Sequence, residues 1–373
     1  MPEPGPVYLD HNATTPVAPE VAKAMWPYLV EHFGNPSSDH AFGRAARAGV
    51  DLAREQVAAL IGARPEEIVF TSGGTEANNL AIRGSSVAAH ARVAVTTAVE
   101  HPASTAPLGL LAAGGWRVDT LPVDRDGRAD PAAIPDGPIG LASVILAQNE
   151  VGTIQPVAAI AEASHRAGGL VHADAAQAVG KIDVEVDAIG IDLLSIAGHK
   201  LYAPKGVGAL YVRRGTPMSP LLVGAAQEHG LRPGTENVAG IVGLGAACAL
   251  AGDLLAAEPA RQEVLREGLW TALAASIPGL VRLSPAQGCL PNTLTIALPG
   301  RIGADILAAA PGVAASTGSA CHAGTHTPSA TMLAMGVDPI AAVGALRLTL
   351  GRATTVEDVR TAAQALAHAI TIA

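Results

Sequence analysis

Seven short β-rich runs alternate with helical segments along the first two thirds of the chain, and this alternation constrains the fold more than any other feature. The runs are Glu67–Thr71, Arg92–Thr97, Trp116–Leu121, Ile139–Ala147, Leu170–Asp174, Asp192–Ala197 and Gly208–Arg213. Such alternation is typical of an α/β fold with a doubly wound, mainly parallel sheet flanked by helices. Ligands in these folds bind beyond the carboxyl ends of the strands, so the polar residues found there are candidates for a site.

The pattern changes near Leu254–Pro259, where a second unit begins. Its predicted elements are a charged helix, two strands and a last helix, over Pro259–Leu273, Thr293–Ala297, Leu346–Leu350 and Thr355–Ile372. We therefore expect a large domain over residues 16–250 and a smaller α+β domain formed by residues 1–15 and 255–373.

Composition excludes several classes of function. The net charge is -9 and no Lys/Arg block is present, which argues against nucleic acid or an anionic membrane as the main partner. No uninterrupted apolar stretch reaches about 18 residues, and the first residues are neither basic nor apolar, so we expect no membrane span and no signal peptide. The cysteines Cys248, Cys289 and Cys321 are far apart and form no CxxC, which indicates neither a disulfide framework nor a zinc site and favours the cytoplasm.

Two predicted strands end in ionisable residues whose combination is informative. The run from Asp192 leads into Gly198-His199-Lys200, and an earlier run ends in Asp174. A lysine at the end of a buried strand is costly unless its charge is used or removed. One use is an imine with an aldehyde cofactor, whose ring nitrogen a carboxylate can hold in the protonated form. Lys200 and Asp174 therefore point to pyridoxal 5'-phosphate (PLP); a surface-pointing lysine is the alternative.

Other polar residues follow neighbouring strands. The stretch Thr71–Asn78 contains two glycines and opens a helix, so its backbone N–H groups and the Thr75 hydroxyl can face an anion; an ordinary capped turn is the alternative. His101 either lies on a cofactor ring and moves protons or is a loop histidine. Asn149 and Gln177 either contact the ring hydroxyl or serve in capping and turns.

Three further segments contain candidates. Arg232 and Thr235 lie in a polar loop that either meets an anion or is a solvated connection. Arg347, in an alternating strand, suits a substrate carboxylate, with a surface arginine as the alternative. Cys321 lies in a stretch of small polar residues, so we expect a mobile thiol whose thiolate form His322 favours; an incidental loop cysteine is the alternative.

Taken in order, these motifs resemble the NifS/IscS-like cysteine desulfurases, which belong to the class-V aminotransferases of PLP fold-type I. The resemblance covers nearly the whole chain, from Tyr-Leu-Asp-His-Asn-Ala-Thr-Thr-Pro at residues 8–16 and Gly-Asn-Pro-Ser-Ser at 34–38 to Leu-Arg-Leu-Thr-Leu-Gly-Arg at 346–352. It implies PLP as the cofactor and conversion of L-cysteine to L-alanine, with a persulfide left on Cys321 for a sulfur-acceptor protein.

The resemblance also implies a role for each matching residue. Lys200 binds the cofactor and removes the substrate α-proton, Asp174 pairs with the ring nitrogen, and His101 stacks on the ring. Asn149 and Gln177 contact the ring hydroxyl. The phosphate is held by Gly74, Thr75, His199 and, from the partner subunit of a homodimer, Thr235. The substrate carboxylate is held by Arg347 and Asn149 with Asn35.

Departures from the family pattern leave two alternatives. Ala197 stands where a phosphate-binding serine is usual, which removes a hydrogen bond worth about 1.5–3 kcal/mol. Relatives resembling selenocysteine lyases also have an apolar residue there, so a lyase for L-selenocysteine or a related C–S/C–Se lyase is the first alternative. His11, Ala197 and the altered loop at residues 225–229 motivate the second, a non-catalytic sulfur-relay subunit. For the desulfurase we expect a cytoplasmic role such as iron–sulfur cluster assembly.

Overall fold

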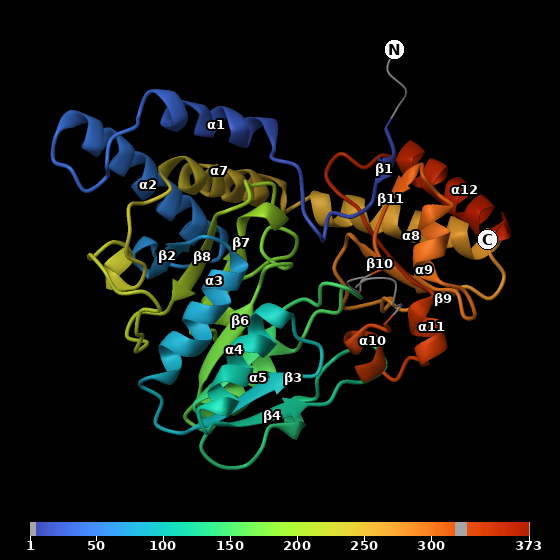
Figure 1. Cartoon of the computed structure of the whole chain (residues 1–373), viewed down its shortest axis with the longest axis horizontal. Helices are drawn as coiled ribbons and strands as arrows, with labels where there is room; N and C mark the ends of the chain where they lie inside the picture. The colour runs from blue at the N-terminus through green and yellow to red at the C-terminus, as the bar shows by residue number, and fades with distance from the viewer. Residues whose placement is uncertain (1–4, 318–326, 373) are drawn as a thin grey trace.

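A computed structural model describes residues 5–317 and 327–372 (Figure 1). Its largest sheet has seven strands in the order β2-β8-β7-β6-β5-β3-β4. These strands are β2 (Ile68–Thr71), β3 (Val93–Thr97), β4 (Arg117–Leu121), β5 (Leu141–Ile145), β6 (Leu170–Asp174), β7 (Leu193–Ala197) and β8 (Gly208–Val212). β8 runs antiparallel to both of its neighbours, β2 and β7, and the other six strands point in one direction. The predicted mainly parallel α/β sheet is confirmed, with every strand within two residues of its predicted ends.

Helices cover both faces of this sheet because successive side chains of a strand point to opposite faces. In β2, Ile68 and Phe70 pack into a core with helices that include α2 and α7, whereas Val69 packs on the other face with Leu80. Figure 1 shows α1, α2 and α7 lying together, with α3 and α4 across the sheet. The helices around the sheet are α1 (Pro19–Val30), α2 (Ala41–Leu60), α3 (Gly74–Asn79), α4 (Pro102–Ala113), α5 (Val157–Arg166), α6 (Val186–Ile189) and α7 (Val238–Leu254).

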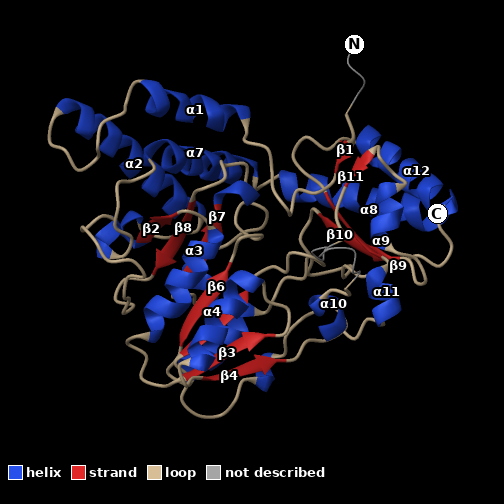
Figure 2. Ribbon diagram, viewed as in Figure 1, coloured by secondary structure: helices blue, strands red, loops and turns tan. Residues whose placement is uncertain are grey.

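The C-terminal elements form a second layered unit with its own core (Figure 2). An antiparallel sheet in the order β12-β10-β9 consists of β9 (Val281–Arg282), β10 (Thr293–Ala297) and β12 (Ala345–Thr349). The helices of this unit are α8 (Glu258–Ser276), α9 (Gly303–Ala308), α10 (Ala330–Ala334), α11 (Pro339–Val343) and α12 (Val356–Ile372). Leu9, from the N-terminal segment, is fully buried in this core. The domain boundaries given above stay a prediction.

Two short strands join the N-terminal segment to the C-terminal unit. β1 (Val7–Tyr8) pairs in parallel with β11 (Val313–Ala314), and Asp10 forms a bridge with Thr349. The strands β1, β9 and β11 were not predicted, because two residues are too few to show a hydrophobic period. This pairing fixes the segment that follows β1 beside the carboxyl ends of the large sheet.

By length and composition, none of the described helices could cross a membrane alone; α7 and α8 pass such a test only as a pair, bent by 76°. Residues of α7 such as Leu244 and Cys248 are fully buried in the core beneath the large sheet.

Candidate active site

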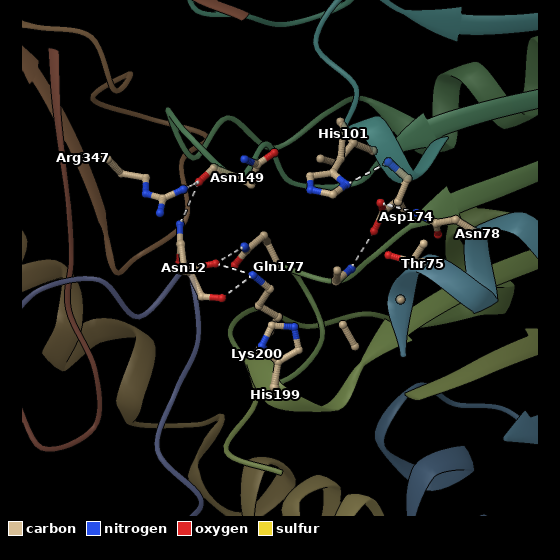
Figure 3. Close-up of a pocket in the computed structure, with 16 residues that line it drawn as sticks. Asn12, Thr75, Asn78, His101, Asn149, Asp174, Gln177, His199, Lys200 and Arg347 are labelled. Atoms are coloured by element: carbon tan, nitrogen blue, oxygen red, sulfur yellow. Dashed lines mark hydrogen bonds between the residues drawn. The ribbon is translucent and has the colours of Figure 1, made fainter. Parts of the chain in front are cut away.

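The carboxyl ends of β2, β3, β5, β6 and β7 surround a cavity of about 410 Å³ (Figure 3). On the side of the C-terminal unit, this cavity is lined by residues of the N-terminal segment and of β12. Ten of the thirteen predicted site residues line it, and these are Gly74, Thr75, His101, Asn149, Asp174, Gln177, Ala197, His199, Lys200 and Arg347. The parallel strands bring together residues from Gly74 to Lys200, and Arg347 reaches the same cavity from β12 of the second sheet. Ligand binding at this edge of the sheet is what the fold class predicts.

Lys200 follows β7 in a single 3-10 turn and points into the cavity. Its Nζ donates hydrogen bonds to the backbone carbonyls of Asn12 at 2.6 Å and Ala13 at 2.8 Å. Burial lowers the pKa of Lys200 to about 8, and the positive charge of Arg347 contributes to this shift. The alternative of a surface lysine is therefore wrong. An amine with this pKa is neutral in part of the molecules near neutral pH, which a nucleophile requires.

Asp174 ends β6 and is only 3% exposed. Its Oδ2 accepts a hydrogen bond from Asn78 Nδ2 at 2.7 Å, and its Oδ1 accepts one from the backbone N–H of Ala176 at 3.1 Å. Both oxygens are thus held in place while the carboxylate lines the cavity. Sequence reasoning missed Asn78, although it lies in the quoted stretch after β2; its signal was an amide at the start of a helix beside a candidate site.

His101 combines a local structural role with a place in the cavity wall, and its stacking on a cofactor ring stays a prediction. It caps the N-terminus of α4, since its Nδ1 accepts a hydrogen bond from the backbone N–H of Ala103 at 3.0 Å. The same bond fixes the ring in the wall of the cavity, where burial lowers its pKa. A neutral imidazole with a fixed face suits packing against an aromatic ring.

The loop between β2 and α3 packs directly on β7 and β8. Gly73 has φ 148°, a conformation that favours glycine. A Cβ on Gly208 would lie 2.7 Å from Gly73 Cα, and one on Gly74 would lie 3.1 Å from Ala197 Cβ. This close approach places Gly74 and Thr75, at the start of α3, in the cavity wall. Free N–H groups at a helix start favour an anion.

His199 lines the cavity next to Lys200. Its Nδ1 lies 3.1 Å from Thr14 Oγ1. Burial, with the charge of Lys200 as the next contribution, lowers the pKa of His199 to about 4. The ring is therefore neutral near pH 7 and can donate a hydrogen bond to a phosphate oxygen from one nitrogen.

Arg347 lies in β12 and is 7% exposed, so the alternative of a surface arginine is wrong. Its Nη2 pairs with Asp10 Oδ1 at 2.8 Å, and its Nη1 donates to the backbone carbonyl of Asn149 at 3.2 Å. Its Nε is buried and has no hydrogen-bond partner among the described residues. Arg347 lines the cavity, and a guanidinium there suits a ligand carboxylate.

Asn12 connects the two sides of the site and was also missed. Its backbone oxygen accepts from Gln177 Nε2 at 2.9 Å as well as from Lys200. Its side chain bonds to Asn292 at 3.0 Å and to Thr293 at 2.9 Å, both in the C-terminal unit. Only the motif at residues 8–16 pointed to this segment, and nothing local distinguished Asn12 from its neighbours.

Among the described residues, the predicted Thr235 and Asn35 do not line this cavity. Thr235 and Asn35 are exposed, and Asn35 Oδ1 accepts from the backbone N–H of Ser37 at 2.9 Å. The contribution of Thr235 to a partner subunit and the carboxylate role of Asn35 stay predictions. Cys321 and His322 lie outside the described residues.

The residues in the cavity fit PLP. An amine, a held carboxylate, a neutral imidazole and a helix start match the aldehyde, ring nitrogen, ring face and phosphate of this cofactor. Fold and cavity together define a PLP-dependent enzyme of fold-type I.

Comparison with known proteins agrees with this class. The profile of the family "Aminotransferase class-V" matches residues 7–361. A cysteine desulfurase of Enterobacter agglomerans is 45% identical over 355 residues, which cover 93% of this chain and 88% of that protein. The cysteine desulfurase IscS of Dictyoglomus turgidum is 44% identical over 360 residues, covering 94% and 91%. A solved NifS-like protein superposes with a TM-score of 0.91 at 34% identity and covers 99% of this chain and 100% of that one.

The chain therefore belongs to the class-V aminotransferases, a family of PLP-dependent enzymes, and within them to the NifS/IscS-like cysteine desulfurases. The resemblance inferred from the sequence motifs is confirmed.

Proposed function

We propose that this protein converts L-cysteine to L-alanine and leaves the removed sulfur as a persulfide on Cys321. One observation carries the proposal. The cavity has the Asp174 carboxylate on one side, the Arg347 guanidinium on the other and the Lys200 amine between them (Figure 3). The carboxylate and the amine suit a pyridine aldehyde, and the guanidinium suits the carboxylate of an amino acid.

The side of the cavity formed by the large sheet would hold the cofactor. Bound PLP supplies an electron-accepting ring that stabilises negative charge on the substrate Cα. Lys200 Nζ would hold the aldehyde carbon, and the charge of Asp174 would keep a proton on the ring nitrogen. His101 would cover one face of the ring. The donors to the ring oxygen and the phosphate would be Asn149, Gln177, Gly74, Thr75, His199 and the partner subunit's Thr235.

The substrate side would orient the amino acid. The guanidinium of Arg347, which lines the cavity, offers a charge-assisted hydrogen bond to the α-carboxylate, with Asn149 and Asn35 as further contacts. Once released from the cofactor, the Lys200 amine acts as the base that takes the Cα proton and returns it to the product. Its pKa of about 8 suits both directions of this transfer near neutral pH.

Sulfur transfer needs no external oxidant or reductant. The Cys321 thiolate attacks the sulfur of the substrate, so an S–S bond forms while the Cβ–S bond breaks. The bond electrons stay on Cβ, which takes up a proton and becomes the methyl group of alanine. The enzyme thiol is thereby oxidised to a persulfide, and the carbon is reduced by the same two electrons.

A cysteine replacement with a matched control tests this proposal. We expect Cys321→Ala to lose sustained formation of alanine and sulfide from L-cysteine in the PLP-loaded protein. Cys289→Ala serves as the control, because burial raises the pKa of the Cys289 thiol to about 11 and leaves it a poor nucleophile. A Cys321→Ala protein that forms both products at the wild-type rate would contradict the role of Cys321.

A homodimer is part of the proposal. The surface of α1 and α2 with their connecting loop exposes large apolar side chains, including Trp26 at 62% and Phe33 at 71%, which a second subunit would cover. The exposure of Thr235 supports a contribution to the cavity of the partner. Light scattering of the purified protein should give twice the mass of one chain; a monomeric mass at working concentration would contradict this part.

The persulfide would be transferred to an acceptor protein in the cytoplasm, with iron–sulfur cluster assembly as the proposed use. A pull-down with Cys321 loaded with sulfur would identify the acceptor. Ala197 lines the cavity where the family usually has a phosphate-binding serine, so a selenocysteine lyase is the second candidate. Parallel measurement of kcat/KM for L-cysteine and L-selenocysteine distinguishes the desulfurase from the lyase. Negligible turnover of L-cysteine would favour the lyase.

A further inference from the structure

A second lysine lies directly behind the cavity. Lys181 follows β6, four residues after Gln177, and its Nζ donates to Gln177 Oε1 at 2.5 Å and to Asn12 Oδ1 at 3.1 Å. Both acceptors are neutral amide oxygens of almost fully buried residues. The roles proposed above leave this amine unused.

The contacts of Gln177 fix the orientation of its amide. Its Nε2 donates to the backbone oxygen of Asn12, which can only accept, and its Oε1 receives an N–H of Lys181. A flipped amide would place its oxygen against the carbonyl of Asn12 and its NH2 group against the lysine amine. Both hydrogen bonds would be lost, one of them charge-assisted. Gln177 therefore keeps its NH2 end on the side of Asn12 and Lys200.

We propose that Lys181 is a positioning residue that holds the Gln177 amide with its NH2 group available to the ring oxygen of PLP. The inference rests on the proposed placement of the cofactor ring and deepens it. Without Lys181, only the bond from Gln177 Nε2 to the Asn12 carbonyl opposes a flip that would present the amide oxygen to the ring oxygen. An oxygen there repels the negative charge that an N–H donor stabilises.

Lys181 lies close to two other cations of the site. Burial lowers the pKa of Lys181, and the nearby cations Lys200 and Arg347 lower it further. The positive charge of Lys181 in turn lowers the pKa values of His11 and His199, after burial as the main cause. The protonated amine can only donate and therefore requires the oxygen end of Gln177, whereas a neutral amine could also accept a hydrogen bond. The Asn12 carbonyl requires the NH2 end of Gln177 in either state, so the positioning by Lys181 is strongest while its amine is protonated.

The test is the pH titration of the visible absorbance of the bound cofactor. Losing a donor to the charged ring oxygen makes that group more basic, so Lys181→Met should raise the midpoint by about one pH unit. Gln177→Met should raise it similarly. In the double variant we expect the midpoint of Gln177→Met alone, because Lys181 acts through Gln177. Lys205→Met removes an exposed lysine near His199 and should stay within about 0.2 unit of wild type.

Two results would overturn the inference: an unchanged midpoint in Lys181→Met, or shifts that add fully in the double variant, which would indicate a direct charge effect. If Lys181→Met does not fold, Lys181→Gln removes the charge and shortens the reach, and it should also raise the midpoint; an unchanged value would again overturn the inference. Alanine formation is measured separately. Normal titration behaviour without alanine formation would contradict the proposed function and leave the positioning role supported.

Discussion

The two sides of the cavity differ in how their charged groups are satisfied. On the cofactor wall, which we define as Asp174, Asn78 and His101, both oxygens of the carboxylate accept hydrogen bonds from the protein. On the substrate wall, defined as Arg347, Asp10 and Asn149, the guanidinium is paired with Asp10 yet keeps a buried Nε–H without a partner among the described residues.

The difference fits a resident ligand on one side and a transient one on the other. A held carboxylate is ready for a cofactor that remains bound through many turnovers. A guanidinium whose protein partners leave one donor unsatisfied is suited to a carboxylate that arrives and leaves with each turnover. The following predictions test whether the walls are as separate as this comparison implies.

Replacement of the lysine between the walls should have the largest effect. Lys200→Ala removes both the attachment of the cofactor and the base, so alanine formation should fall by about 10³-fold or more. The visible absorbance of the bound cofactor should change with it. Lys205 is an exposed lysine five residues further along, and Lys205→Ala should keep the wild-type rate of alanine formation and the wild-type absorbance of the cofactor. A Lys200→Ala protein that retains a tenth of the wild-type rate of alanine formation would contradict the proposed roles of Lys200.

Replacement of the arginine should affect the substrate alone. Arg347→Ala removes one charge-assisted interaction, so KM for L-cysteine should rise by about 10- to 100-fold. Arg282 is a matched control in the same sheet, because it pairs with Glu267 and lies outside the cavity wall. Arg282→Ala should lower thermal stability and leave KM near the wild-type value; the reverse pattern would contradict the substrate wall.

The pH dependence of cofactor loading sharpens the description of Lys200. Only the neutral amine reacts with the aldehyde, and its pKa is about 8. Stopped-flow mixing of apoprotein with PLP should therefore give a rate that rises about tenfold per pH unit below this value and levels off above it. A rate that keeps rising to the ordinary lysine pKa of 10.5 would indicate an amine exposed to water.

The smallest effect is expected from a replacement near the proposed phosphate site, and it concerns the affinity for PLP. Ala197→Ser adds the hydroxyl that the family usually has at this position beside Gly74. One additional hydrogen bond to the phosphate should lower the Kd for PLP by about tenfold, which corresponds to the lower end of the range of about 1.5–3 kcal/mol given above. Equilibrium binding to apoprotein measures this, and a weaker affinity would mean that the close packing of Ala197 on Gly74 leaves no room for the hydroxyl.

Sequence reasoning predicted the ionisable residues at the strand ends better than the hydrogen-bonded residues that hold them, such as Asn78 and Asn12. Strand ends are local signals, so apolar runs that end in Asp174 and Lys200 identified both residues and the edge of the sheet where they meet. Asn12 bonds to Asn292 across 280 positions and to Lys181 across 169, and no local pattern encodes such contacts. Lys181 also looks like an ordinary turn lysine until the fold brings Asn12 beside it.

The pairing of Arg347 shows the same limit. Its strand was predicted from alternation, but the Asp10 carboxylate that orients it comes from the opposite end of the chain. Polar groups that connect distant segments depend on tertiary packing, whereas strand periodicity depends on neighbours in sequence.

The most direct test of the two-wall account is the Kd for PLP of Asp174→Asn and Arg347→Ala, measured side by side on apoprotein. We predict a loss of about 10- to 100-fold in affinity for Asp174→Asn, since the charge facing the ring nitrogen is removed, and a value within about threefold of wild type for Arg347→Ala. Equal losses of affinity in the two variants would contradict the separation of cofactor and substrate walls.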